Sequence, residues 1–278
     1  MTRAARIVAV LALLSAPALA SAAAQVPAQP HSYSGFDKDD YPGDALLPAL
    51  HRAFAFTGFW LNNPPGMTTN PWAGKRSVVR AAGFGFLILF NGRLDTELQH
   101  SDPAALGHSD GTAAIAAAHR EGFPPGAILF LDQEEGGPLL DEQAAYLGAW
   151  IAAVKTSAYD PGVYVSGIPV PAGRGVRIST AQDVQSRFPG TQLWIWDDRC
   201  PPAPGCVMPG TSLTFAGSGL AHVLVWQYAQ SPRRKADTAS CRRTYAPDGN
   251  CYAPGLPHSD ATYIDLDLSA SPDPSRGR

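Results

Sequence analysis

Short apolar segments alternate with helical segments along most of this chain, and this alternation limits the possible folds more than any other feature. A short apolar run bounded by turn residues is typical of a strand buried on both faces. The clearest helical segment is 141–156, where Tyr146, Trp150 and Val154 recur at i, i+4 and i+8 and form one apolar face. The predicted strands are 33–37, 56–61, 84–90, 127–131, 162–166, 193–196, 222–228 and 262–268.

Helices are predicted between most of these strands, at 45–53, 75–82, 111–121, 141–156 and 180–187. The interval before the last strand holds glycine, proline, cysteine and basic residues instead of a helix pattern. Regular βα alternation over this length predicts a parallel (β/α) barrel of the TIM type, in the α/β class, rather than separate domains. A doubly wound sheet is the structural rival, but no Gly-x-Gly-x-x-Gly follows the first strand.

The first residues predict an export signal. Arg3 and Arg6 precede the apolar run 7–14, and small residues suitable for cleavage follow at 18–20 and 22–24. The run is too short to span a bilayer, and no later stretch is a membrane candidate. We therefore expect a signal peptide over 1–24, one domain over 31–268, a loose Pro/Ser-rich tail over 269–278, and a secreted or periplasmic protein.

Charge and cysteine content agree with this compartment. The formal net charge is −3 and becomes more negative once the signal is removed, which disfavours nucleic acid as a partner. Export favours disulfides over metal ligation, and no pair has the spacing of a structural zinc site. Close spacing favours the pairs Cys200–Cys206 and Cys241–Cys251, although four cysteines allow three connectivities.

The strand 127–131 ends in two carboxylates, Asp132 and Glu134. Because strand side chains alternate, both leave the same face, with Cα atoms about 7 Å apart. In a barrel, polar residues at strand ends converge on one mouth. The same rule adds Asp37, Gln227, Asp265 and either Asp197 or Asp198.

Each of these residues also has a simpler interpretation. A single aspartate after a strand, such as Asp37, is often a helix cap or turn residue. Glu135 should point away from the acid pair, and Asp198 beside Arg199 could form a surface ion pair. A basic loop is expected to be solvated, with contact to an anionic wall polymer as the alternative; it contains Arg233, Arg234, Lys235, Arg242 and Arg243.

Aromatic residues accompany the acids on the later strands: Tyr164, Trp194, Trp196, Trp226 and Tyr228. Carboxylates with aromatic platforms are what glycosidic-bond cleavage requires, because one acid protonates the leaving oxygen and sugar faces stack on rings. Crowding should raise the pKa of at least one carboxyl. Scattered histidines without H-x-x-x-H spacing and the lack of Gly-x-Ser-x-Gly disfavour zinc and serine hydrolases. No metal or cofactor is expected.

Six motifs occur in a characteristic order: SGFD at 34–37, LFLDQE at 129–134, GVYVSG at 162–167, LWIW at 193–196, VWQY at 225–228 and YIDLD at 263–267. Together they resemble the glycoside-hydrolase-like domain of unknown function in exported bacterial proteins. That domain is a relative of the family 25 lysozyme-type muramidases. The resemblance covers nearly the whole mature chain. It implies an irregular barrel of five βα units closed by three further strands.

The resemblance also implies a chemistry. Family 25 enzymes cleave the β-1,4 bond of peptidoglycan after N-acetylmuramic acid, with retention and without a metal. Glu134 resembles the general acid, Asp132 the carboxylate that assists the N-acetyl group, and Asp37 and Asp265 the flanking acids. Sugar-binding positions are expected at Tyr164, Trp194, Trp226, Gln227 and Tyr228.

One departure from the muramidases is the sequence Trp196-Asp197-Asp198, where they carry a small residue and then an aromatic one. The inserts after the sixth and seventh strands would also lie at the mouth and reshape it. The prediction is therefore an exported glycosidase acting on peptidoglycan or another N-acetylated glycan. The alternative is a catalytically inactive barrel that binds wall glycan or serves envelope assembly.

Overall fold

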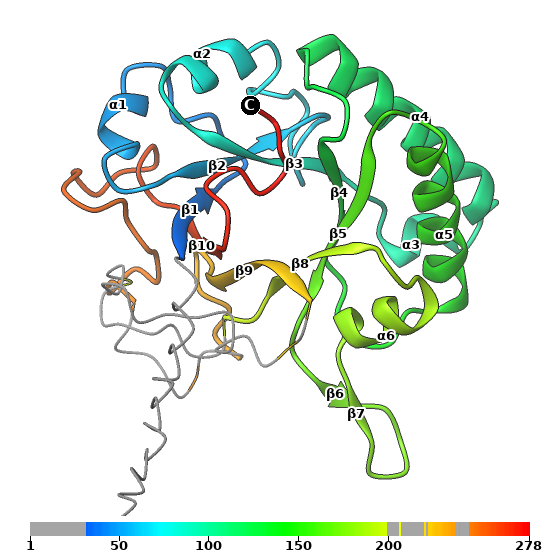
Figure 1. Cartoon of the computed structure of the whole chain (residues 1–278). Helices are drawn as coiled ribbons and strands as arrows, with labels where there is room; N and C mark the ends of the chain where they lie inside the picture. Colours follow the sequence, from blue (N-terminus) through cyan, green and yellow to red (C-terminus); the bar gives the residue numbers. More distant parts are fainter. Residues whose placement is uncertain (1–31, 199–205, 207–219, 221, 237–238, 240–244) are drawn as a thin grey trace, which may run out of the picture.

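The computed structural model describes residues 32–198, 206, 220, 222–236, 239 and 245–278. The signal segment predicted over 1–24 lies outside this part of the chain. Eight strands form a closed barrel in the order β1-β10-β9-β8-β5-β4-β3-β2, with helices around its outside (Figure 1). The barrel strands are β1 Tyr33–Asp37, β2 Phe56–Trp60, β3 Gly85–Asn91, β4 Ile128–Gln133, β5 Asp160–Ser166, β8 Gln192–Trp196, β9 Val223–Ala229 and β10 Asp265–Ser269.

The predicted barrel is confirmed, and each predicted strand and helix is present, most of them with shifted ends. The helices are α1 Leu47–Leu50, α2 Arg76–Ala81, α3 Asp95–Leu98, α4 Pro103–Glu121, α5 Asp141–Lys155 and α6 Thr180–Arg187. Sequence patterns did not predict the short α3. They also missed a two-stranded hairpin, β6 Val170–Pro171 with β7 Arg177–Ile178, which projects from the barrel (Figure 1).

The last barrel strand departs from the predicted parallel arrangement. β10 is antiparallel to both neighbours, β1 and β9, whereas the other neighbouring strands are parallel. A parallel return needs a long crossover, usually a helix, and the described residues between β9 and β10 contain no α-helix. The chain therefore enters β10 from the mouth and runs back. Asp265, its first residue, lies at the mouth for this reason.

Helix α4 begins earlier than the sequence predicted. The carboxylate of Asp102 accepts a hydrogen bond from the N–H of Ala105 at 3.0 Å, and Pro103 occupies the first helical position. The small residues of α4 let it approach α5 closely: a Cβ at Gly107 would lie 2.1 Å from the carbonyl oxygen of Tyr146. This close pair of helices covers the outside of the barrel beside β4 and β5 (Figure 1).

The C-terminal segment, which we expected to be loose, instead packs against the end of the barrel opposite the mouth. The N–H of Phe86 donates to Asp273 at 2.9 Å, and the N–H of Ile88 donates to the Ser275 hydroxyl at 2.9 Å. Ser275 is fully buried, and its carbonyl accepts from Ile128 at 2.9 Å. The side chains of Asp273 and Ser275 thus pair N–H groups of β3, and the Ser275 carbonyl pairs the first N–H of β4, whereas composition alone suggested a loose tail.

The favoured cysteine pairing is wrong for the two cysteines that can be assessed. Cys206 is bonded to Cys251, with a Cα–Cα distance of 5.2 Å. Cys206 follows β8 and Cys251 follows β9, and these two strands are neighbours in the barrel. The disulfide therefore joins cysteines that follow neighbouring strands, not cysteines that are close in sequence. Cys200 and Cys241 lie outside the described residues.

No helix in the described part of the chain combines the length and apolar character needed to cross a membrane.

Candidate active site

A pocket of about 190 Å³ opens at the mouth of the barrel. All four predicted acids line it, as do three of the predicted sugar-binding residues. The lining residues are Asp37, Asp39, Trp60, Leu89, Asp132, Glu134, Tyr164, Trp194, Gln227, Gln230, Ser231, Pro232, Arg234 and Asp265. The structure therefore brings side chains from β1, β4, β5, β8, β9 and β10 into one acidic pocket.

The two carboxylates of β4 differ in their surroundings. Asp132 is 4% exposed, and its Oδ1 atom has no hydrogen-bond partner among the described residues. Glu134, one residue beyond the strand, is exposed to solvent at the pocket. Glu135 points elsewhere, as predicted: its carboxylate accepts from the N–H of Asp95 at 2.8 Å, at the start of α3. The Asp132 carboxyl is therefore held in the pocket wall, while the Glu134 carboxyl is accessible.

A hydrogen-bonded chain joins the acid of β1 to the wall formed by β5 and β9. Gln227 Nε2 donates to Asp37 Oδ1 at 2.8 Å, and the Tyr164 hydroxyl donates to Gln227 Oε1 at 2.7 Å. Asp37 and Asp265 are paired in register across β1 and β10. Asp265 accepts from the N–H of Ser231 at 2.6 Å. These contacts fix both flanking acids beside Gln227.

A further aspartate lies deeper on β10. Asp267 is fully buried and accepts from Trp194 Nε1 at 3.0 Å. After burial, the charge of Asp37 is the next largest cause that raises the pKa of Asp267. Trp194 is thereby a wall residue whose N–H serves the carboxylate beneath the pocket.

Burial is the main cause of raised pKa values in this pocket. It raises the pKa of Asp132, Asp265 and Asp267 well above the ordinary range, and the charges of neighbouring acids act in the same direction. Burial raises the pKa of Asp37 to about 6. Partial burial, with the charges of Asp37 and Glu134, raises the pKa of Asp39 to about 7. The pocket therefore retains protons near neutral pH.

This retention predicts a pH-dependent stability. The native chain keeps a proton on Asp37 that the unfolded chain releases near its ordinary pKa of 3.8, so the free energy of unfolding falls as the pH rises toward 6 and above. Asp37→Asn removes this contribution. The free energy of unfolding of the variant minus that of the natural chain should therefore increase by about 2–3 kcal/mol from acidic to mildly alkaline pH. Urea unfolding at several pH values measures it; a pH-independent difference would contradict it.

The structure does not bring Trp226 and Tyr228 to this pocket. They alternate with Gln227 along β9 and so occupy its other face. The indole N–H of Trp226 donates to the carbonyl of Asp197 at 3.1 Å, and the rings of Trp226 and Tyr228 pack with centroids 5.8 Å apart. Both residues serve packing in this structure.

Asp197 and Asp198, which follow β8, do not occupy the positions expected from the sequence. The N–H of Asp197 donates to the carbonyl of Gln227 at 3.0 Å, and Asp197 is not among the pocket-lining residues. Asp198 is fully buried, which does not fit a surface ion pair. The guanidinium of Arg234 lies 4.0 Å from the centroid of the Trp196 ring. Arg234, expected in a solvated loop, is thus held at the pocket by a cation–π contact.

The sequence analysis did not identify three acidic or polar residues that line the pocket: Asp39, Gln230 and Ser231. Asp39 lies two residues after Asp37, the spacing that singled out Asp132 and Glu134, so the same rule could have found it. Gln230 follows β9 by one residue, and no sequence signal distinguished it from a turn residue.

A second pocket of about 410 Å³ adjoins the first, because Asp132 and Glu134 line both. The loop after β2 and the segment after β3 form its remaining wall. The residues are Pro65, Gly66, Asn91, Gly92, Arg93, Leu94 and Glu97. The acid pair of β4 therefore lies on the boundary between two neighbouring hollows.

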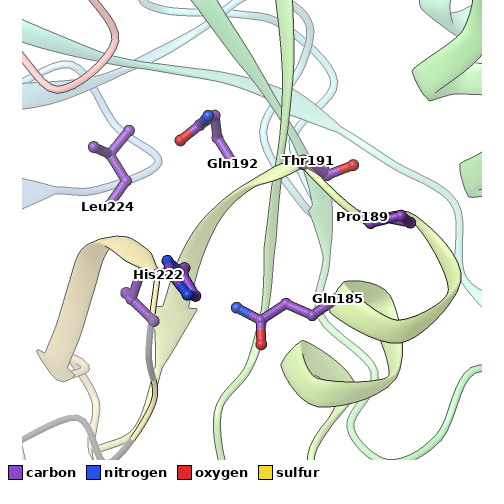
Figure 2. Close-up of a pocket in the computed structure, with 8 residues that line it drawn as sticks. Gln185, Pro189, Thr191, Gln192, His222 and Leu224 are labelled. Atoms are coloured by element: carbon purple, nitrogen blue, oxygen red, sulfur yellow. The ribbon is translucent and has the colours of Figure 1, made fainter.

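A third hollow, of about 630 Å³, lies at the other end of the barrel, where β8 and β9 begin (Figure 2). Its labelled residues include Gln185, Thr191, Gln192 and His222. The described residues that line it include no carboxylate. No group of three or more potential metal ligands occurs among the residues covered by the structure. The acidic pocket is accordingly the candidate site.

A family model for the Rv2525c-like glycoside hydrolase-like domain matches residues 56–199 of this chain. This match covers the strands from β2 to β8, including the acid pair. The chain belongs to this family. The resemblance stated from the ordered motifs is thereby confirmed. None of the curated proteins searched matches the chain.

Solved structures share the fold of this family member. An uncharacterized protein of B. stearothermophilus has a TM-score of 0.55 at 20% identity, over 85% of this chain and 95% of that one. The Tat-secreted protein Rv2525c of Mycobacterium tuberculosis, in complex with HEPES, has a TM-score of 0.50 at 10% identity, over 87% and 96%. The spore cortex lytic enzyme SleM of Clostridium perfringens has 0.50 at 14%, over 86% and 68%.

Proposed function

We propose that this protein is an exported glycosidase that cleaves peptidoglycan or another N-acetylated glycan by carboxylate acid catalysis with help from the substrate. The supporting observation is the acid pair of β4. An exposed Glu134 and a buried Asp132 lie in one pocket, on its boundary with a second one. A glycan chain lying across both pockets would present a glycosidic bond to this pair.

The proposed first step uses Glu134 as the general acid. Glu134 transfers its proton to the glycosidic oxygen while the acetamido carbonyl oxygen of the sugar attacks C1, so the C1–O bond breaks and an oxazolinium ring forms. Asp132 accepts a hydrogen bond from the acetamido N–H and orients that group. The unpartnered, buried Oδ1 of Asp132 suits this acceptor role.

The second step reverses the proton transfer. Water attacks C1 from the side that the leaving group vacated, Glu134 takes a proton from it, and the ring opens to regenerate the acetamido group with retained configuration. Because the substrate supplies the nucleophile, no second carboxylate needs to bond to C1. Asp37 and Asp265, fixed through Gln227 and Ser231, would contact hydroxyl groups of the same sugar.

Export rests on two supporting observations. The disulfide between Cys206 and Cys251 is typical of proteins outside the cytoplasm. The related protein Rv2525c is described as Tat-secreted. We also propose that the barrel and its C-terminal segment form one domain, since residues beyond 269 pair with β3 and β4.

The identity of the new chain end tests the bond assignment. We expect purified peptidoglycan treated with the mature protein to yield fragments that end in reducing N-acetylmuramic acid, because the proposed roles match those of the muramidases. Borohydride reduction followed by mass spectrometry identifies this end. Fragments ending in N-acetylglucosamine would contradict the proposed bond, and unchanged peptidoglycan would contradict the proposed substrate.

A non-catalytic glycan-binding barrel is the second candidate. Burial raises the pKa of Asp132, Asp265 and Asp267. Neutral carboxyls bind sugar hydroxyl and amide groups, but they stabilise developing positive charge less than carboxylates do. This candidate predicts glycan binding without new reducing ends.

A further inference from the structure

Gln230 lies just after β9 and closes one side of the acidic pocket. Its side chain is buried, with 7% of the residue exposed, and it lines the pocket. Gln230 Nε2 donates to Gln227 Oε1 at 2.7 Å and approaches the Tyr164 hydroxyl at 3.0 Å. The amide nitrogen is therefore committed to the pocket wall.

The carboxylate of Asp37 determines which way this amide points. At pH 7, above its pKa of about 6, Asp37 is ionised and only accepts hydrogen bonds, so the atom of Gln227 that lies 2.8 Å from its Oδ1 is the nitrogen. Gln227 Oε1 then accepts, and its neighbour at 2.7 Å must be the nitrogen of Gln230. The oxygen of Gln230 is left as the remaining polar atom of that side chain.

That oxygen is buried and has no hydrogen-bond partner among the described residues, like Oδ1 of Asp132. The two atoms come from β4 and from the residue after β9, strands separated in the barrel by β5 and β8. An unpaired buried acceptor destabilises the free protein, and a ligand that donates to it recovers much of this free energy. The pocket thus offers two acceptors to a ligand with two donors.

We propose that Gln230 determines sugar specificity by accepting a hydrogen bond from a hydroxyl or acetamido N–H of the bound glycan. This inference rests on the proposed function, and it adds a requirement for a free donor at the sugar position facing β9. A sugar substituted at that position, or lacking the donor, leaves Gln230 Oε1 unpaired and binds less tightly.

Binding in a Glu134→Gln background tests the proposal without turnover. The ligands are chitobiose and derivatives in which each hydroxyl in turn is replaced by hydrogen, or the acetamido N–H by N-methyl. We expect Gln230→Met to weaken chitobiose binding about 5- to 10-fold by calorimetry, as for one neutral hydrogen bond. The derivative that lacks the donor should bind equally to the Glu134→Gln parent and to the Gln230→Met variant. The identity of that derivative shows whether a hydroxyl or the acetamido N–H donates to Gln230.

Two further variants complete this design. Gln99→Met alters an exposed glutamine outside the pocket and should bind chitobiose like its parent. Gln230→Ala gives the same comparison if methionine disturbs folding. Equal affinity of the Gln230 variants and their parent for every ligand would overturn the specificity role while leaving the proposed function in place. Absence of glycan binding by the Glu134→Gln parent would overturn both.

Discussion

Replacing Glu134 by glutamine is expected to slow glycan cleavage by about 10²–10⁴-fold. The amide has nearly the same shape as the carboxyl but cannot give a proton to the glycosidic oxygen or take one from water. Because Glu134 is exposed and no hydrogen bond of its side chain supports the fold among the described contacts, folding and glycan binding should be preserved. Release of reducing ends from peptidoglycan measures the rate, and calorimetry measures binding.

Glu135→Gln is the matched control for this experiment. Glu135 is the next residue, lies outside the pocket, and accepts from the N–H of Asp95 and from Gln143. A glutamine oxygen can still accept from the Asp95 N–H, so turnover should stay close to that of the natural chain. Equal loss of turnover in both variants would assign the effect to a disturbed strand end and remove the support for Glu134 as the acid.

Deleting residues 272–278 is expected to lower the free energy of unfolding by about 3–6 kcal/mol. The deletion removes the partners of three strand N–H groups, those of Phe86, Ile88 and Ile128. Leaving a buried donor unpaired costs about 1–3 kcal/mol each. It also uncovers apolar surface where β3 and β4 begin, since Ser275 is fully buried there. Urea unfolding measures the difference.

Arg276→Ala is the control in the same segment. Arg276 pairs with Asp160 at the surface, where both side chains are more than half exposed. Exposed ion pairs contribute at most about 1 kcal/mol, so this variant should unfold almost like the natural chain. If the truncated protein were as stable as the natural one, residues 272–278 would not stabilise the barrel, and the prediction would be contradicted.

Much of the barrel could be predicted because strand and helix periods are local properties. The strand spanning Tyr33–Asp37 and the helix spanning Thr180–Arg187 have the predicted ends. The direction of β10 and the Cys206–Cys251 bond could not be predicted this way, since both depend on which strands become neighbours. The role of the C-terminal segment depends on open strand N–H groups more than 140 residues earlier, such as those of Phe86 and Ile88.

The candidate site was predictable where strand alternation applies. That rule placed Asp132 and Glu134 together, and it could have added Asp39 and excluded Trp226 and Tyr228, since Gln227 faces the pocket between them. Gln230 and Arg234 follow β9 in an irregular segment, where no periodicity predicts the direction of a side chain. Gln230 is held by Tyr164, 66 residues earlier, and by the nearby Gln227, whereas Arg234 is held by Trp196.

The proposed glycosidase activity is tested most directly by measuring whether this protein turns over peptidoglycan. The mature natural chain and its Glu134→Gln variant are incubated with purified peptidoglycan, and both new reducing ends and bound protein are measured. We expect reducing ends to accumulate in proportion to the concentration of the natural chain, whereas the variant binds equally and releases almost none. Equal binding by both proteins with no release by either would contradict it.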